Sequence, residues 1–269
     1  MRGIVTMTMA FLAAVFCCKG AVVDTLSIAS PYLGSAESVC VISPDSAYQK
    51  SCPTIYLLNG YDGNHLSWLQ LTRPDLPELS DKYGVIFVMP DGRDSWYWNS
   101  PVVPDMQMES FFVEDLVPYI DSHYNTIPDS SHRAVTGLSM GGQGAFWLAI
   151  NHPGVWKNVG SMSGGLNICK FPGKWKMSNW LGDYENNEDE WNRHAIVNNV
   201  SRIAPGELNI IFDCGIEDFF YEVNEQMHLN LADAEIPHEY STRKGNHSHS
   251  YWADSIINHI EFFLANFGK

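Results

Sequence analysis

A short motif in the middle of the chain has the residue types and spacing of a serine nucleophile. Residues 137–141 read Gly-Leu-Ser-Met-Gly, the Gly-x-Ser-x-Gly pattern of a nucleophile elbow, with Ser139 at its centre. Residues 133–136 predict a strand before the motif, and residues 142–150 predict a helix after it. A tight turn would explain the pentapeptide alone, but not its place between a strand and a helix. The pattern therefore predicts that Ser139 attacks a carbonyl group, next to a helix N-terminus that favours developing negative charge.

A serine hydroxyl needs a base within hydrogen-bonding reach and an acid that orients that base. In a strand–elbow–helix architecture the acid follows the serine in the chain, and the histidine follows the acid. Residues 213–218 hold three acidic side chains after a predicted strand. Asp213 would lie within the strand end, so we choose Asp218, with Glu217 as the close alternative.

Residues 245–252 form the loop after the last predicted strand and contain two histidines, His247 and His249. We choose His247 as the general base. A metal site of His238, His247 and His249 is a rival interpretation, but no nearby carboxylate completes a recognisable ligand spacing. We therefore expect neither a metal ion nor another cofactor.

Attack on a carbonyl creates an oxyanion, which needs two hydrogen-bond donors aimed at it. The backbone N–H of Met140, directly after the nucleophile, is one expected donor. The backbone N–H of Tyr61, in the loop after an early predicted strand, is the other.

Aromatic residues gather in segments that are predicted to meet as loops. These residues are Trp68, Trp96, Tyr97, Trp98, Trp175 and Trp180. A Trp-Tyr-Trp triplet cannot bury all of its rings on one face of a strand. We expect part of it to form an exposed platform for an aromatic or sugar-bearing substrate, and we assign Trp96, Trp98 and Trp180 to substrate binding.

Apolar runs and helical periodicity alternate along the chain, which predicts a mainly parallel sheet with helices on both faces. Residues 165–200 interrupt this rhythm, and we interpret them as an excursion near the active site. Edge strands are expected within residues 21–50, where the alternation is seen at 38–42. Further strands are expected at 54–58, 85–89, 133–136, 159–163, 208–212 and 238–242. The helices are expected at 109–125, 142–150, 221–234 and 252–264.

The N-terminus has the pattern of a secretory signal peptide at residues 1–20, with Arg2 before an apolar run. The mature chain would be a single domain, 21–269, and secreted or periplasmic. The run is short for a membrane span, so a retained anchor is the competing interpretation. A lipoprotein is less favoured, because Phe16 and Cys17 precede the candidate cysteines where small residues are expected.

The 269-residue chain carries 16 basic and 31 acidic residues, a net charge of −15. This balance argues against a nucleic-acid partner, since phosphate binding needs a basic surface. Export would permit a disulfide, and Cys40 and Cys52 flank a turn-rich segment that such a bridge could staple. The sequence spacing neither requires nor excludes a Cys40–Cys52 disulfide. Cys214 lies in an apolar run that predicts a buried thiol.

The motifs together resemble the putative-esterase family of α/β-hydrolases, which includes esterase D and carbohydrate esterase family one. The matching stretches are 56–60, 137–142, 214–218 and 245–247 with Trp252. The resemblance implies an α/β-hydrolase fold over about residues 38–263 and supports His247 over His249. It places Ser139, Asp218 and His247 in a catalytic triad, and Tyr61 and Met140 in the oxyanion hole. Asn59 departs from the histidine that many members carry.

We therefore expect a secreted serine carboxylesterase that acts on small-molecule or oligosaccharide esters. Feruloyl or acetyl esters on plant polysaccharide fragments are the favoured substrates. An acyltransferase with the same acyl-enzyme and a general short-chain esterase, of the tributyrin or S-formylglutathione type, are the alternatives. A non-catalytic carbohydrate-binding module would typically lack a triad member, and this chain keeps candidates for all three.

Overall fold

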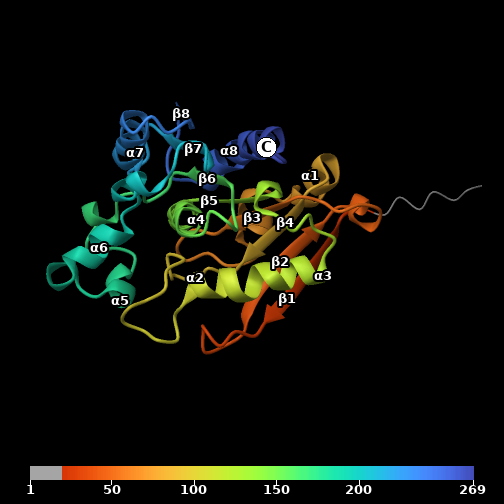
Figure 1. The fold of residues 1–269 in the computed structure, drawn as a ribbon, viewed down its shortest axis with the longest axis horizontal. Coiled ribbons are helices and arrows are strands. Elements are labelled where there is room, and N and C mark those ends of the chain that lie inside the picture. Colours follow the sequence, from red (N-terminus) through yellow and green to blue (C-terminus); the bar gives the residue numbers. More distant parts are fainter. Residues whose placement is uncertain (1–19) are drawn as a thin grey trace, which may run out of the picture.

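The computed structural model describes residues 20–269, which fold around one eight-stranded sheet (Figure 1). The strand order is β1-β2-β4-β3-β5-β6-β7-β8. Strand β2 is antiparallel to β1 and β4, and all other neighbouring pairs are parallel. This confirms the expected mainly parallel sheet. The strands are β1 (Val22–Ile28), β2 (Glu37–Ser43), β3 (Thr54–Leu58), β4 (Ile86–Pro90), β5 (Arg133–Gly137), β6 (Asn158–Met162), β7 (Asn209–Gly215) and β8 (Glu239–Arg243).

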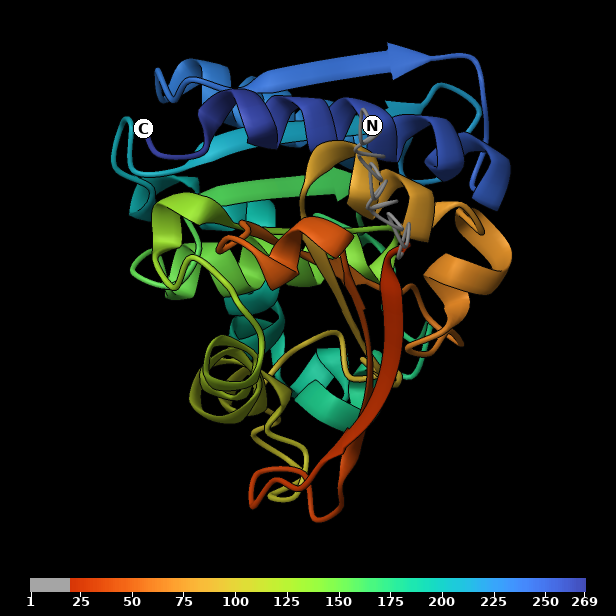
Figure 2. The ribbon, with the colours of Figure 1, turned by 90° about the vertical axis from the view of Figure 1, so that its right-hand side faces the viewer.

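Helices cover both faces of the sheet, because successive strand residues point to opposite sides and both sides are apolar. One core packs strand residues against α2, α3, α4 and α7, and the other packs them against α1 and α8. Figure 2 shows α8 and α1 on the same side of the sheet. The helices are α1 (Leu76–Tyr83), α2 (Met108–Ser110), α3 (Val117–His123), α4 (Met140–Asn151), α5 (Met177–Leu181), α6 (Glu188–His194), α7 (Tyr221–Asp233) and α8 (His249–Asn266).

Two segments differ in detail from regular α/β alternation. The helix expected at 109–125 passes through a π-helical stretch, Phe111–Leu116, before α3 begins. Pro118 falls in the first turn of α3, where a missing N–H is tolerated. Residues 165–200 form the expected excursion, which contains α5 and α6 and lies at one end of the molecule (Figure 1).

The proposed signal peptide at residues 1–20 lies, apart from Gly20, outside the described residues. Within residues 20–269, no helix combines the length and the apolar character that crossing a bilayer requires.

Cys40 and Cys52, whose pairing the sequence did not decide, are free thiols in the structure. Cys40 packs in the core on the α1 and α8 side of the sheet, whereas Cys52 packs in the core on the opposite side. A Cys40–Cys52 bridge is therefore not formed, because the sheet separates the two side chains. Cys214 is fully buried, as predicted, and burial raises the pKa of its thiol.

The turn between β5 and α4 depends on glycine for steric reasons. A Cβ on Gly137 would lie 2.5 Å from the carbonyl carbon of Gly141, and a Cβ on Gly141 would lie 2.5 Å from the backbone oxygen of Leu58. Both obstacles are backbone atoms, which cannot rotate away. The glycines thus let α4 begin directly above the end of β3.

We expect Gly141→Ala to lower the free energy of unfolding by about 2 kcal/mol or more, because the added methyl group forces β3 and α4 apart. Urea denaturation measures the change. Gly154→Ala is the matched control, since a Cβ there would have no atom within 4 Å, and its effect should stay within about 0.5 kcal/mol. Equal stability of the two variants would contradict this explanation of the motif.

Candidate active site

Ser139 stands at the elbow in a strained backbone conformation. Its φ and ψ are 57° and −117°, a region that non-glycine residues seldom adopt. The backbone N–H of Ser139 donates to Met162 O at 2.9 Å, which anchors the turn to the end of β6. The strain raises the hydroxyl above the carboxyl ends of the parallel strands, where ligands bind in open α/β sheets.

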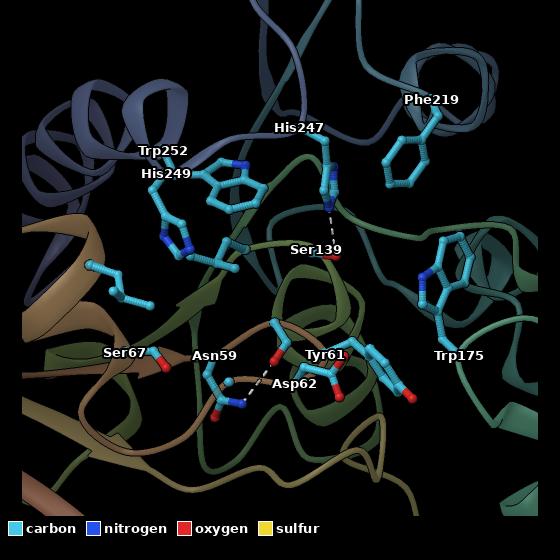
Figure 3. A pocket seen from close by; sticks show the side chains of 14 residues that line it. Asn59, Tyr61, Asp62, Ser67, Ser139, Trp175, Phe219, His247, His249 and Trp252 are labelled. Atoms are coloured by element: carbon cyan, nitrogen blue, oxygen red, sulfur yellow. Dashed lines mark hydrogen bonds between the residues drawn. The ribbon is translucent and has the colours of Figure 1, made fainter.

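The structure brings Ser139, His247 and Asp218 together from three separate segments. His247 Nε2 lies 2.9 Å from Ser139 Oγ, and its Nδ1 lies 2.9 Å from Asp218 Oδ2 (Figure 3 shows the first contact). The ionised carboxylate only accepts hydrogen bonds, so Nδ1 carries the proton and Nε2 accepts from the serine hydroxyl. This arrangement can remove the hydroxyl proton during attack on a carbonyl carbon.

The loops that carry Asp218 and His247 cross in close contact. Glu217 N donates to Gly245 O at 2.9 Å, and a Cβ on Gly215 would lie 2.3 Å from the same oxygen. The Asp218 side chain is fully buried, and its Oδ1 also accepts the backbone N–H of Phe220 at 2.8 Å. Glu217, the alternative acid, is exposed and does not contact His247. The geometry thus selects Asp218.

The two expected oxyanion donors lie beside Ser139. Within residues 20–269, the backbone N–H groups of Tyr61 and Met140 donate no hydrogen bond, so both are available to an oxyanion. Asn59 orders the Tyr61 loop, because its Nδ2 donates to Gly60 O and its Oδ1 accepts from Gly92 N, both at 2.9 Å. Asn59 therefore holds the loop that carries the Tyr61 N–H.

A cavity of about 350 Å³ opens over Ser139. Trp175 and Phe219 form one wall, with their rings stacked at 5.8 Å and 22°. Ser67 and His249 lie on the other side of Ser139 (Figure 3). The remaining lining residues are Asn59, Gly60, Tyr61, Asp62, Gly63, Leu71, Leu138, His247 and Trp252.

Comparison with known proteins identifies the family of the chain. The family model described as "Putative esterase" matches residues 30–263, which is most of the chain. The chain belongs to this esterase family. It is a carboxylic ester hydrolase with an α/β-hydrolase fold.

Proteins similar to this esterase are named for several different activities. An acetyl esterase of Caldicellulosiruptor saccharolyticus is 27% identical, and the alignment covers 82% of this chain and 89% of the relative's length. An S-formylglutathione hydrolase of Mus musculus is 24% identical, and the alignment covers 90% of this chain and 93% of the relative's length. A solved ferulic acid esterase aligns with a TM-score of 0.78 and 25% identity, over 93% of this chain and 99% of that one.

The aromatic platform expected at Trp96 and Trp98 is wrong. These residues of the esterase are 1% and 0% exposed, and neither lines the cavity. Trp96 and Tyr97 have φ values of 56° and 66°, so the triplet turns sharply instead of continuing as a strand. Tyr97 then inserts under α4, where a Cβ on Gly144 would lie 2.2 Å from its ring.

The three tryptophans assigned to substrate binding have supporting positions instead. Trp96 packs behind Trp175, with the ring centroids 6.1 Å apart. Trp180 is half-buried, and its Nε1 donates to Asp94 O at 2.7 Å, which fastens the excursion to the neighbouring loop. Trp180 does not line the cavity.

Phe219 is one of several lining residues that sequence reasoning missed. It directly follows Asp218, is half exposed, and contacts the His247 ring with centroids 4.3 Å apart. Its position next to the predicted acid is the sequence feature that could have identified it as a lining residue. Trp252, noted in the sequence for its spacing from His247, packs edge-on against that ring at 4.8 Å.

The histidines of the rival metal site are not gathered in one place. His249 Nδ1 lies 2.8 Å from Thr72 Oγ1, whereas His238 Nε2 lies 2.8 Å from His228 Nδ1. Among residues 20–269, no group of three histidine, cysteine or acidic side chains is arranged to hold a metal ion.

Asp213 belongs to a buried network behind the active site. Its Oδ2 lies 2.9 Å from His259 Nε2, and His259 Nδ1 lies 2.9 Å from Thr136 Oγ1, two residues before Leu138 in the elbow. Arg243 also reaches Asp213 and stacks 3.6 Å from the Tyr251 ring, which packs against Gly245. The network joins the elbow strand to the start of the His247 loop.

Proposed function

We propose that Ser139, His247 and Asp218 are the catalytic triad of an exported serine esterase. The observation that carries this proposal is the continuous hydrogen-bonded path from Asp218 through His247 to Ser139 Oγ. His247 Nε2 takes the serine proton as Oγ bonds to the ester carbon. Asp218 holds the imidazole in the reactive tautomer and stabilises its charged form.

The tetrahedral oxyanion accepts hydrogen bonds from the Tyr61 and Met140 backbone N–H groups, which have no competing partner in the described chain. The C–O bond to the alcohol then breaks, and His247 gives its proton to the leaving alkoxide. Water attacks the acyl-enzyme with His247 again as base, which releases the acid and restores Ser139.

We propose feruloyl or acetyl esters on plant polysaccharide fragments as substrates. The stacked Trp175 and Phe219 rings offer an aromatic face beside Ser139 that suits a phenolic acyl group. The names of two relatives, a ferulic acid esterase and an acetyl esterase, support the same substrate class. Secretion or a periplasmic location is proposed from the signal-like residues 1–20.

The test compares kcat/KM on methyl ferulate, acetylated xylan, S-formylglutathione and a naphthyl acetate. We expect a feruloyl or acetylxylan ester to have the highest value. If the feruloyl ester is preferred, Trp175→Ala should lower kcat/KM for methyl ferulate about tenfold more than for naphthyl acetate.

Trp175→Phe keeps an aromatic ring in the wall and should retain most of the preference. Preference for S-formylglutathione would contradict the polysaccharide assignment and favour the hydrolase activity of the mouse relative. A product ester formed with an added sugar acceptor, in place of free acid, would instead indicate an acyltransferase.

A further inference from the structure

Outside the aromatic wall of Trp175 and Phe219, the cavity lining carries unused hydrogen-bonding groups. We call Asp62, Ser67 and His249 the polar wall; all three line the cavity. Figure 3 shows Ser67 and His249 on the opposite side of Ser139 from the two aromatic rings. None of the three belongs to the path from Asp218 to Ser139, so the proposed chemistry leaves their role open.

His249 presents a fixed donor to the cavity. Its Nδ1 lies 2.8 Å from the hydroxyl of Thr72, a residue only 5% exposed. That hydroxyl has no other hydrogen-bond partner in the described chain, so its proton is satisfied only if Thr72 donates to Nδ1. The imidazole proton then sits on Nε2, which makes no hydrogen bond to residues 20–269. Burial and the neighbouring His247 also lower the pKa of His249, which favours this neutral form.

Ser67 and Asp62 complete a mixed set of donors and acceptors. Ser67 Oγ accepts the backbone N–H of Asn64 at 2.9 Å, which leaves the hydroxyl proton free to donate. The Asp62 carboxylate is exposed at the rim and makes no hydrogen bond or ion pair with residues 20–269. The wall thus offers two neutral donors and one anionic acceptor.

We propose that the polar wall binds the hydroxyl groups of a sugar, as the alcohol-side subsite of the esterase. Each sugar hydroxyl both donates and accepts, which matches the mixed set. The two sides of an ester extend in opposite directions from the carbon at Ser139, and the aromatic wall suits the acyl side. The uncharged alcohol is favoured because Asp62 repels an anionic one. This inference rests on the proposed function.

The test uses ester pairs that share an acyl group and differ in the alcohol. One pair is methyl 5-O-feruloyl-arabinofuranoside and methyl ferulate, and the other is an O-acetyl methyl xyloside and ethyl acetate. For each pair we measure the ratio of kcat/KM for the sugar ester to that for the simple ester. His249→Phe, which keeps a ring but removes the donor, should lower this ratio about three- to tenfold.

Thr72→Val removes the hydroxyl that fixes the imidazole proton on Nε2, so it should lower the same ratio by a smaller factor. Asp62→Asn keeps a residue that tolerates the φ of 60° and should also lower the ratio, through a weaker acceptor. His123→Phe, at an exposed histidine outside the cavity, is the control and should leave the ratio unchanged.

An unchanged ratio in His249→Phe and Asp62→Asn overturns the sugar subsite while the proposed function stands. An equal loss on both esters of a pair also overturns it, because it shows a general effect on the active site. If the wild-type enzyme hydrolyses neither pair yet cleaves a chromogenic acetate, both the subsite and the proposed substrate class are rejected, and only the esterase chemistry remains.

Discussion

Ser139→Ala is expected to lower kcat for a chromogenic acetate ester by a factor on the order of 10⁵ or more, because Ser139 Oγ is the oxygen that lies 2.9 Å from His247 Nε2, the proposed base. The residual rate comes from the oxyanion donors and substrate binding alone. Initial rates at saturating substrate measure the change, and thermal unfolding checks that the variant is folded.

Ser250→Ala is the matched control, since Ser250 is exposed near the start of α8 and lies outside the cavity. It should keep the wild-type rate. Turnover by Ser139→Ala that approaches the wild-type value would reject the nucleophile assignment, and with it the mechanism proposed above.

The second large effect concerns His247 and His249, which lie two residues apart in the chain. His247→Ala should lower kcat by about 10⁴-fold or more, because Ser139 loses its base and Asp218 loses its partner. His249→Ala should lower kcat for the same ester far less, since His249 contacts Thr72 and not the nucleophile. A pre-steady-state burst experiment adds a second measurement, because the acylation step itself should disappear in His247→Ala.

The two variants are controls for each other, because each removes one imidazole and the two positions are two residues apart in the chain. A greater loss in His249→Ala than in His247→Ala would transfer the base role to His249. It would also require the loop to rearrange, because His249 Nδ1 is bonded to Thr72 in the structure.

Features that depend on local chemistry or on the order of residues along the chain could be predicted from the sequence. The Gly-x-Ser-x-Gly motif predicts its own turn, because only glycine fits where a Cβ would meet backbone atoms. Apolar runs identify strands that are covered on both faces, and the order of serine, acid and histidine limits the candidates to a few residues. The choice of Asp218 and His247 agrees with the geometry, although neighbouring Glu217 and His249 offered the same functional groups.

Long-range packing, in contrast, fixes which side chains face the cavity. Trp96 and Trp98 are buried because two successive residues adopt positive φ, and composition does not encode that turn. Cys40 and Cys52 are close in sequence but lie on opposite sides of the sheet. The contacts of Thr72 with His249 and of Trp175 with Phe219 join segments far apart in the chain. Such contacts depend on how loops converge above the sheet, and local periodicity carries no information about that convergence.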